Sequence, residues 1–339
     1  MKPETQAIHV PQRQGGDIAP AVRLTTTFEH GPANELTHGY VYVRHGNPNS
    51  ADLETRLAAL EGGIDAVSFA SGMAAGVAML HTLPRGSTVV FHDTIYFDFL
   101  TVGRRFLRDW GITPKVVDFR NLDALREACD DTVSLLWFET PTNPTIDLVD
   151  IRGVVQLAAD IGAKTFVDGT FASPALQRPL ELGVDYVMHS LTKYIGGHSD
   201  VQGGAVVVRD DADAVAELRQ VRKLTGGVLA PFNAWLAARG LQTLHCRVEK
   251  HCANAQAVAD ALAGHARVET LRYPFHASHP QFELARSQMS AGGGMLSIDG
   301  AGGREAALKV AGVLKLIANA TSLGGTETLV EHRKSIEGP

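Results

Sequence analysis

The chain has 339 residues, of which 45% are hydrophobic and 20% are charged, and its formal net charge is -6. These values are ordinary for a folded globular protein with two domains, or with one large domain and one smaller one. The negative net charge gives no electrostatic reason to expect nucleic acid or an anionic membrane as a partner.

The cysteines and the apolar segments indicate the cellular compartment. The three cysteines, Cys129, Cys246 and Cys252, form no Cys-x-x-Cys pair and leave one thiol over in any pairing scheme, which favours a reducing environment. The N-terminal residues show no signal-peptide pattern, and no apolar run reaches the roughly 18 residues that a membrane helix needs. We therefore expect a cytoplasmic protein without a membrane partner, and we expect no metal site.

Residues 1–50 contain many glycines and prolines, too many for a long helix or a central strand. We expect an arm that lies against its own domain or against a neighbouring subunit. Within the arm, Tyr42 and Arg44 combine an aromatic ring with a guanidinium. The guanidinium can hold a phosphate through its planar fork, although a surface ion pair is a simpler explanation, and both interpretations stay open.

The first candidate binding turn follows a predicted helix over Asn49 to Leu60 and a buried strand over Ala66 to Ala70. The strand runs into the small residues Ser71-Gly72-Met73, which open a second helix. Backbone amides at a helix start form an anion site, and glycine lets a phosphate approach the main chain closely. The alternative is that these small residues only let the helix pack closely on a sheet.

Further short apolar segments alternate with amphipathic segments such as 122–129 and 151–161. This alternation predicts an α/β fold with a mainly parallel sheet that is covered on both faces. Ligand-binding side chains are then expected where the strands end. The predicted strands are 88–92, 115–118, 134–138, 164–168, 186–188 and 204–208.

Two of these strands end in polar residues that draw attention. The segment Glu139 to Pro144 follows one strand, and Asp168 ends the next. A buried carboxylate is costly unless it is paired, and a protonated heterocyclic nitrogen is a suitable partner. Alternatively, Asp168 caps a turn or pairs with an arginine.

A third polar segment, Tyr186 to Asp200, contains Ser190, Thr192 and Lys193 just past a strand end. Lys193 has two interpretations. It is either a solvated surface lysine, as most lysines are, or a desolvated amine beside a phosphate site that forms a Schiff base with an aldehyde cofactor.

The pattern changes after about Gly226. Apolar residues recur at helical spacing from Pro231 to Leu262, which predicts a long helix connecting two domains. Predicted strands at 267–273 and 294–298 and a helix over 305–318 suggest a smaller α/β unit. The expected division is an arm at 1–50, a large domain at 51–230 and a small domain at 231–339.

Together, the phosphate-type turn, the strand-end aspartate and the strand-end lysine provide what pyridoxal 5'-phosphate (PLP) requires of a protein. The chain closely resembles the Cys/Met-metabolism family of PLP enzymes, the transsulfuration group that includes cystathionine γ-synthase, cystathionine γ-lyase, cystathionine β-lyase and methionine γ-lyase. The resemblance begins near Thr5, and the stretch from His189 to Asp200 is its most specific part. It implies the type I aminotransferase fold, with a mainly parallel seven-stranded sheet and a smaller, C-terminally shortened α/β domain.

The resemblance also implies roles for individual residues around the cofactor. Lys193 would be the Schiff-base lysine, and Asp168 would pair with the pyridine nitrogen. Tyr96 would stack on the cofactor ring and serve with Lys193 as a catalytic acid or base. The implied phosphate ligands are Ser190, Thr192 and the backbone of Gly72 and Met73.

The remaining implied roles concern the substrate and a second subunit. Asn143 would lie near the substrate carboxylate, and Ser322 would border the active site. Tyr42 and Arg44 would reach the phosphate of the neighbouring subunit's cofactor, which implies a homodimer or homotetramer with shared sites.

The implied activity is β- or γ-elimination, or γ-replacement, on cystathionine, homocysteine, methionine or an O-acylhomoserine. Three features depart from the family pattern: Gly169 stands where asparagine is usual, Phe97-Asp98-Phe99 follows Tyr96, and no Arg-x-Ser motif follows Pro339. The last departure predicts weakened activity. The alternative is a catalytically impaired PLP-binding paralogue that acts as a structural or hetero-oligomeric subunit; an aminotransferase is a third, weaker interpretation.

Overall fold

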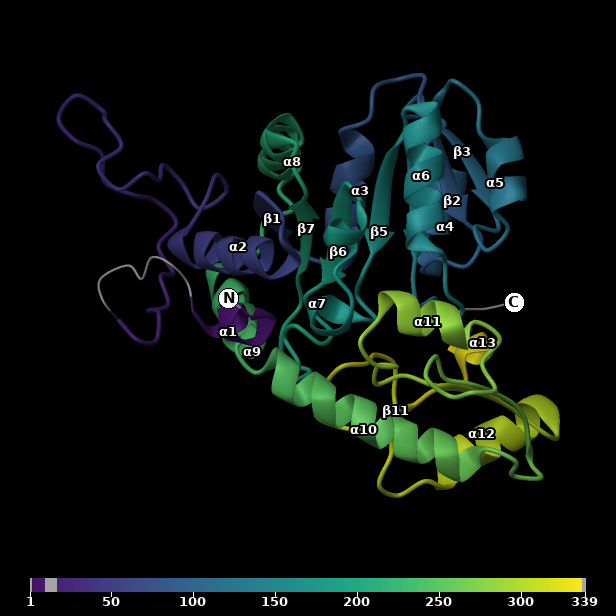
Figure 1. Ribbon diagram of the computed structural model, residues 1–339. Coiled ribbons are helices and arrows are strands. Elements are labelled where there is room, and N and C mark those ends of the chain that lie inside the picture. The colour runs from purple at the N-terminus through teal and green to yellow at the C-terminus, as the bar shows by residue number, and fades with distance from the viewer. Residues whose placement is uncertain (1, 10–16, 337–339) are drawn as a thin grey trace.

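The centre of the computed structural model, which describes residues 2–9 and 17–336, is a seven-stranded sheet with the order β1-β7-β6-β5-β4-β2-β3 (Figure 1). The strands β2 to β6 run parallel to their neighbours within this set, whereas β7 is antiparallel to both β1 and β6. The mainly parallel sheet expected from the sequence is confirmed. The strand bounds are β1 (Asp65–Phe69), β2 (Thr88–His92), β3 (Thr113–Val117), β4 (Val133–Glu139), β5 (Lys164–Asp168), β6 (Tyr186–Ser190) and β7 (Gly204–Val208).

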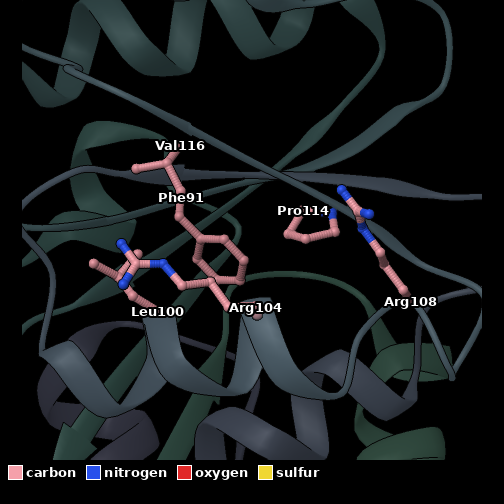
Figure 2. A pocket seen from close by; sticks show the side chains of 7 residues that line it. Phe91, Leu100, Arg104, Arg108, Pro114 and Val116 are labelled. Atoms are coloured by element: carbon pink, nitrogen blue, oxygen red, sulfur yellow. The ribbon is translucent and has the colours of Figure 1, made fainter.

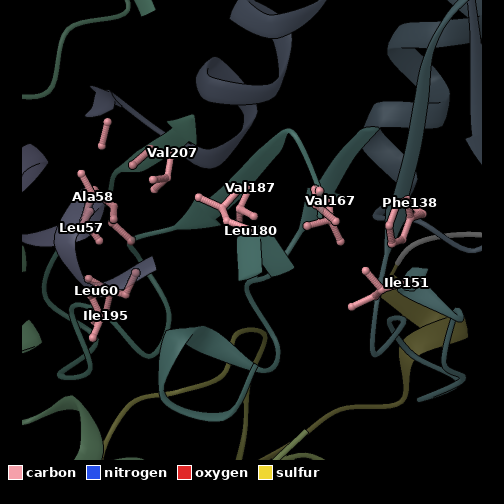
Figure 3. Packing of buried hydrophobic residues seen from close by; sticks show 14 of the residues in the cluster. Leu57, Ala58, Leu60, Phe138, Ile151, Val167, Leu180, Val187, Ile195 and Val207 are labelled. Carbon is pink, nitrogen blue, oxygen red and sulfur yellow. The ribbon is translucent and has the colours of Figure 1, made fainter. Parts of the chain in front are cut away.

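Helices cover both faces of this sheet, so the inner strands carry apolar residues on both faces. Successive side chains of β7 show the arrangement: Val206 and Val208 pack with α3, α4 and α8, whereas Ala205 and Val207 pack with α2, α6 and α9. Figure 3 shows part of this second cluster. The helices on the first face are α3 (Gly72–His81), α4 (Phe97–Arg105) and α8 (Ala212–Thr225), and those on the second are α2 (Pro48–Glu61), α5 (Leu122–Ala128), α6 (Ile151–Ile161) and α9 (Pro231–Leu241).

After α9 the chain forms shorter elements around the long helix α10 (Leu244–Leu262), which lies below the sheet in Figure 1, whereas α1 packs on α2. β8 and β9 are an antiparallel pair close to the two strands predicted there, and β10 and β11 are a short parallel pair that the sequence did not reveal. The bounds are α1 (Pro3–Ile8), α7 (Ser173–Leu176), the 3-10 helix η2 (Pro179–Leu182), β8 (Val268–Arg272), α11 (Phe282–Gln288), β9 (Ser297–Gly300), α12 (Gly303–Val313), β10 (Ala318–Asn319), β11 (Leu329–Val330) and α13 (Arg333–Ile336).

The prediction of a single long helix from Pro231 to Leu262 was wrong, because the chain breaks into α9 and α10 at Gln242 and Thr243. The side chain of Arg247, on the first turn of α10, donates to the carbonyl of Gly240 at 2.7 Å and to that of Tyr194 at 2.7 Å. The helix break therefore lets one guanidinium hold the end of α9 against the loop that follows β6.

Helix α8 was also absent from the prediction, although its ends carry recognisable signals. The Asp211 side chain caps its first turn by accepting the Ala214 N–H, and Gly226 ends it in the left-handed conformation. Arg222 near its end forms a buried ion pair with Glu54 of α2 at 2.6 Å. This pair fastens α8 to the edge of the sheet.

The predicted arm contains little regular structure among residues 17–47; the structure gives it an isolated bridge between Thr27 and Tyr42. Figure 1 shows it extending away from the sheet on the side of α2 and α8. Residues 1 and 10–16 of the predicted arm, and residues 337–339 of the predicted small domain, lie outside the described residues. The division at 50 and 230 stays a prediction.

Candidate active site

Polar side chains end three neighbouring strands of the sheet: Glu139 on β4, Asp168 on β5 and Ser190 on β6. Glu139 pairs in register with Asp168, and Asp168 pairs with Met188. Because side chains alternate along a strand, these three residues share the face of Trp137, Phe166 and Met188, which α3 and α4 cover. The fold therefore gathers them at one edge of the sheet.

Asp168 is buried, with 6% of its surface exposed, and its Oδ1 accepts the N–H of Thr170 at 3.0 Å. Burial raises its pKa above the ordinary value, although the bonds from Thr170 oppose the rise. The Thr170 hydroxyl in turn accepts the N–H of Ser190 at 2.9 Å, so the end of β5 is fastened to the end of β6. A buried carboxylate held in this way suits a cationic partner.

Lys193 lies one turn beyond β6, and its Nζ donates to the Ser322 Oγ at 2.9 Å. Burial lowers the pKa of the amine, the positive charge of Arg333 lowers it further, and Asp168 and Glu331 oppose the shift. A lowered pKa increases the fraction of neutral, nucleophilic amine. Ser322 has a φ of 117°, which non-glycine residues rarely adopt, so the backbone here is held in an unusual conformation to present the hydroxyl.

The phosphate-type turn at the start of α3 lies directly against the end of β6. Ser71 caps the helix by accepting the Ala74 N–H at 3.0 Å, and a Cβ placed on Gly72 would lie 3.2 Å from the Cβ of Ser190. Thr192 uses its hydroxyl to bond both the N–H and the carbonyl of Gly203, at 3.2 and 3.3 Å. A helix N-terminus beside a serine hydroxyl is a suitable cradle for a phosphate.

Glu139 ties together two residues that the sequence singled out. Its Oε2 accepts the N–H of Tyr96 at 2.8 Å, and the carboxyl group is also bonded by the backbone N–H of Asn143. Burial and the neighbouring charge of Asp168 raise the pKa of Glu139 well above the ordinary value, and the two backbone N–H bonds oppose the rise. From the sequence, Glu139 was noted at the end of a buried strand, but no role in the site was predicted for it.

Tyr96 precedes α4 and packs edge-on against Phe97 and Phe99, with ring centroids 5.8 and 6.3 Å away. These two phenylalanines belong to the segment that departs from the family pattern, and here they support the tyrosine ring. Burial and the nearby Asp98 raise the pKa of Tyr96. The phenol is therefore protonated at neutral pH.

Tyr42 and Arg44 are not brought to this edge of the sheet within the subunit. Arg44 is exposed, its guanidinium lies 5.6 Å from the centroid of the Tyr42 ring, and it donates to the carbonyl of Lys223 near the end of α8. Both residues therefore sit on the outward-facing arm.

Gly169 has a packing explanation on the opposite face of the sheet. A Cβ at this position would lie 2.9 Å from Cε1 of His189, which is buried and bonded through Nε2 to Glu61 at 2.5 Å. The ring of His189 thus occupies the space that a larger side chain at 169 would need. Any side chain at position 169 would therefore have to displace the His189 ring.

A pocket of about 360 Å³ lies away from the strand ends, between α4 and the edge strand β3 (Figure 2). It is lined by Phe91, Arg104, Arg108 and their neighbours, and by none of the predicted site residues.

No helix in the described part of the chain is both long and apolar enough to cross a membrane.

Comparisons with known proteins identify the family of the chain. A family profile described as Cys/Met metabolism PLP-dependent enzyme matches residues 4–337. The cystathionine gamma-synthase of Mycobacterium tuberculosis is 43% identical over 335 residues, which cover 97% of this chain and 86% of that protein. The L-methionine gamma-lyase of Pseudomonas putida is 41% identical over 346 residues, which cover 98% of this chain and 86% of that protein.

Solved structures give the same result for the fold. The crystal structure of metB from Corynebacterium glutamicum superposes with a TM-score of 0.96 at 41% identity and covers 99% of this chain and 88% of that one. The cystathionine gamma-lyase of Lactobacillus plantarum, in complex with L-serine, superposes with a TM-score of 0.94 at 34% identity and with the same coverage.

Proposed function

Because the chain belongs to the Cys/Met metabolism family of PLP-dependent enzymes, we propose that its active site is the cluster at the ends of β4, β5 and β6, with Lys193 as the residue that anchors the cofactor. The chain is a PLP-dependent lyase or transferase of the transsulfuration type, and family members act on small amino acids. The relatives named above are synthases and lyases, which disfavours the aminotransferase interpretation.

The observation that carries the residue assignment is that the buried Asp168 and the half-buried Lys193, two oppositely charged groups, lie beside a helix N-terminus. Asp168 and Lys193 feel each other's charge, and both pKa values are shifted by burial. The start of α3 and Ser190 lie at the same edge. A carboxylate, an amine and an anion cradle in one place fit the ring nitrogen, the aldehyde and the phosphate of PLP.

When bound, PLP supplies an electron sink for negative charge that develops on the carbons of an amino acid. In this proposal Asp168 keeps the proton on the ring nitrogen, and the α3 amides with Ser190 and Thr192 hold the phosphate. The Lys193 amine moves protons at the substrate carbons, while Ser322 fixes the position of its Nζ. Tyr96 stacks against the ring and donates a proton, and Asn143 lies on the substrate side.

The proposed reactions are β- or γ-elimination and γ-replacement on cystathionine, homocysteine, methionine or an O-acylhomoserine. The names of the relatives, cystathionine gamma-synthase and methionine gamma-lyase, support a sulfur-containing substrate. Both enzyme types need the same proton transfers at the α and β carbons, which a single mobile amine can serve.

We further propose a homodimer or homotetramer in which Tyr42 and Arg44 complete the site of a neighbouring subunit. Their exposure on an outward-facing arm supports this assignment. Mixing Arg44→Ala subunits with Lys193→Ala subunits should restore activity, since some sites would then combine two intact halves. A mixture as inactive as its parents would contradict the shared site. The cytoplasmic location stays a prediction.

The decisive experiment on the cofactor uses its visible absorption. The purified protein loaded with PLP should show a visible band that borohydride abolishes, because hydride reduces the carbon–nitrogen double bond to a stable secondary amine, and mass spectrometry should then find the modification on the Lys193 peptide. Lys193→Ala should show neither the borohydride-sensitive band nor the modified peptide. A response of the band to cystathionine, homocysteine or O-acetylhomoserine would establish the enzyme, whereas an intact but unresponsive band would favour the impaired paralogue.

A further inference from the structure

The base of the arm, which we define as residues 42–47, is a tight turn that leads into α2. The N–H of His45 donates to the Tyr42 carbonyl at 2.8 Å, and the side chain of Asn47 then caps the start of α2. Tyr42 and Arg44 therefore lie on a turn whose exit is fixed to a helix that packs on the large sheet.

The last turn of α8 contacts the base of the arm at two consecutive positions. Arg222 donates from Nη2 to the His45 carbonyl at 3.5 Å. The next carbonyl group, that of Lys223, accepts from the Arg44 Nη1 at 3.3 Å. The last four carbonyls of a helix lack intrahelical partners and carry partial negative charge, so they attract a guanidinium. The end of α8 thus holds both the backbone of the turn and the side chain of Arg44.

Arg222 is itself held by a buried ion pair. Only 4% of its surface is exposed, and its Nη1 lies 2.6 Å from the Oε1 of Glu54 on α2. Glu54 is buried as well, and it also accepts the N–H and the hydroxyl of Ser68 on β1, at 2.9 and 2.6 Å. A helix and a strand therefore set the orientation of the guanidinium that bonds the arm.

A cavity of about 370 Å³ separates part of the arm from α2 and α8. It is lined by Gly39, His45 and neighbouring arm residues on one side, and by Glu54, Arg219 and Arg222 on the other. A segment beside a cavity has fewer packing contacts, so its polar contacts contribute more to its position. The bond from Arg222 to the His45 carbonyl crosses this boundary.

A purely structural role would make the Glu54–Arg222 pair a fastener between α8 and β1. Two features favour more than that. Buried ion pairs contribute little net stability, because the cost of desolvation offsets the Coulomb attraction, so apolar side chains would join the two elements equally well. The Nη2 of Arg222 also bonds the arm, which an apolar side chain could not do.

We propose that Arg222, oriented by Glu54, fixes the base of the arm and so places Tyr42 and Arg44 for the phosphate site of the neighbouring subunit. The inference rests on the shared site proposed above. Arg222 and Glu54 are positioning residues that act through the arm. Their effect should therefore appear in the cofactor site of the neighbour and not in the site of their own subunit.

The test measures cofactor affinity in the PLP-loaded protein. Dialysis against a series of PLP concentrations, with the visible band recorded at each, gives the Kd of PLP. Arg222→Gln is compared with Arg219→Gln, which removes the same charge one turn earlier on α8. Arg219 bonds Asp65 of β1 at 2.8 Å, and its variant leaves the bond between Arg222 and His45 in place.

Mixed oligomers then separate the contributions of the two subunits. Arg222→Gln chains are co-expressed with a large excess of Lys193→Ala chains, so that most of them have a Lys193→Ala neighbour. A Lys193→Ala chain contributes no visible band, but its arm is intact. The band therefore reports only sites that combine the lysine of an Arg222→Gln chain with the arm of its neighbour.

In the uniform Arg222→Gln protein the Kd of PLP should rise by about tenfold or more, because every arm is displaced and a guanidinium contact to the phosphate is lost. Arg219→Gln should keep the Kd of the unmodified protein. In the mixed oligomers the Kd should return to within about twofold of the unmodified value, because the neighbour supplies an intact arm.

The inference is overturned if Arg222→Gln binds PLP as tightly as Arg219→Gln. It is also overturned if the weakened binding persists in the mixed oligomers, since Arg222 would then act within its own subunit. If Arg222→Gln does not fold, the double variant Glu54→Gln/Arg222→Gln, which removes both buried charges, is judged by the same two criteria. Misfolding of both variants would assign the pair to the core and overturn the inference as well.

Failure of the proposed shared site is distinguishable. Arg44→Ala chains mixed with the same excess of Lys193→Ala chains should also recover their PLP affinity. If they do not, the shared site itself is wrong and this inference falls with it. If they do and the Arg222→Gln chains do not, only the positioning role of Arg222 is wrong.

Discussion

The two halves of the candidate site are built differently. Glu139, Asp168 and Ser190 stand at the ends of adjacent strands in the middle of the sheet, where ladder registers fix their relative positions. Ser322 and Arg333 come from segments after two-residue strands, where side-chain contacts provide much of the positioning. The first set, which we call the rigid half, suits a cofactor that stays bound. The second set, which we call the half with the short ladder, suits a substrate that enters and leaves.

The largest expected effect concerns the rigid half. Lys193→Ala removes both the anchor of the cofactor and the proton-transferring amine, so turnover should fall at least about a thousandfold. Steady-state assays with saturating PLP would measure this loss. Retention of more than a tenth of the activity would contradict the assignment of Lys193.

The next prediction distinguishes the roles of two adjacent carboxyl groups of the rigid half, those of Asp168 and Glu139. Asp168→Asn removes the partner of the ring nitrogen and should lower kcat/KM by about a hundred- to a thousandfold. Glu139→Gln should change it less than about threefold, since the raised pKa favours the neutral form of Glu139 and glutamine still accepts from the Tyr96 N–H.

Glu139→Ala serves as the control for this pair of variants, because it deletes the acceptor for Tyr96 and Asn143 and should be more harmful than Glu139→Gln. A Glu139→Gln variant as impaired as Asp168→Asn would show that Glu139 is ionised, contrary to the electrostatics described above.

A stability measurement tests how tightly Gly169 is packed against His189, on the face of the sheet opposite the candidate site. Gly169→Ala places a Cβ 2.9 Å from the buried ring of His189 and should lower the free energy of unfolding by about 1–3 kcal/mol. Gly227→Ala is the matched control, since its Cβ would meet Ala74 at an ordinary 3.6 Å. Denaturant titration would measure both, and equal values would show that position 169 is not constrained by His189.

The smallest effects are expected in the half with the short ladder. Ser322→Ala removes a single hydrogen bond to the Lys193 Nζ and should lower kcat/KM by about two- to tenfold. The comparison between the halves would fail if this loss equalled that of Asp168→Asn.

The pH dependence of cofactor attachment tests how the charge of Arg333 acts on the Lys193 amine. The neutral Lys193 amine attacks the aldehyde, so the rate of PLP attachment to the apoprotein should rise with pH through the lowered pKa of Lys193. Arg333→Gln removes a charge that helps to lower this pKa, so its rate profile should move to higher pH. Stopped-flow absorbance would record both profiles, and a shift to lower pH would contradict the electrostatic role of Arg333.

Much of the rigid half was predictable because its signals are local. Short apolar segments ending in a carboxylate or a polar turn predicted the strands and the residues at their ends, and the resemblance around Lys193 predicted the family and the cofactor, both of which are confirmed. The split of the predicted long helix into α9 and α10 was not predictable, because Arg247 bonds a loop more than fifty residues away. Arg333 was missed because its polar surroundings carry no periodic signal.

The sequence by itself determined the alternation of strands and helices, the family, and the residue types that PLP needs, since these depend on side-chain chemistry and on spacing along the chain. Only the tertiary structure decided that the pKa of Glu139 is raised by burial, that His189 fills the space beside Gly169, and that the charge of Arg333 lowers the pKa of Lys193. Burial and electrostatic coupling depend on distances between segments far apart in the chain, and packing sets those distances.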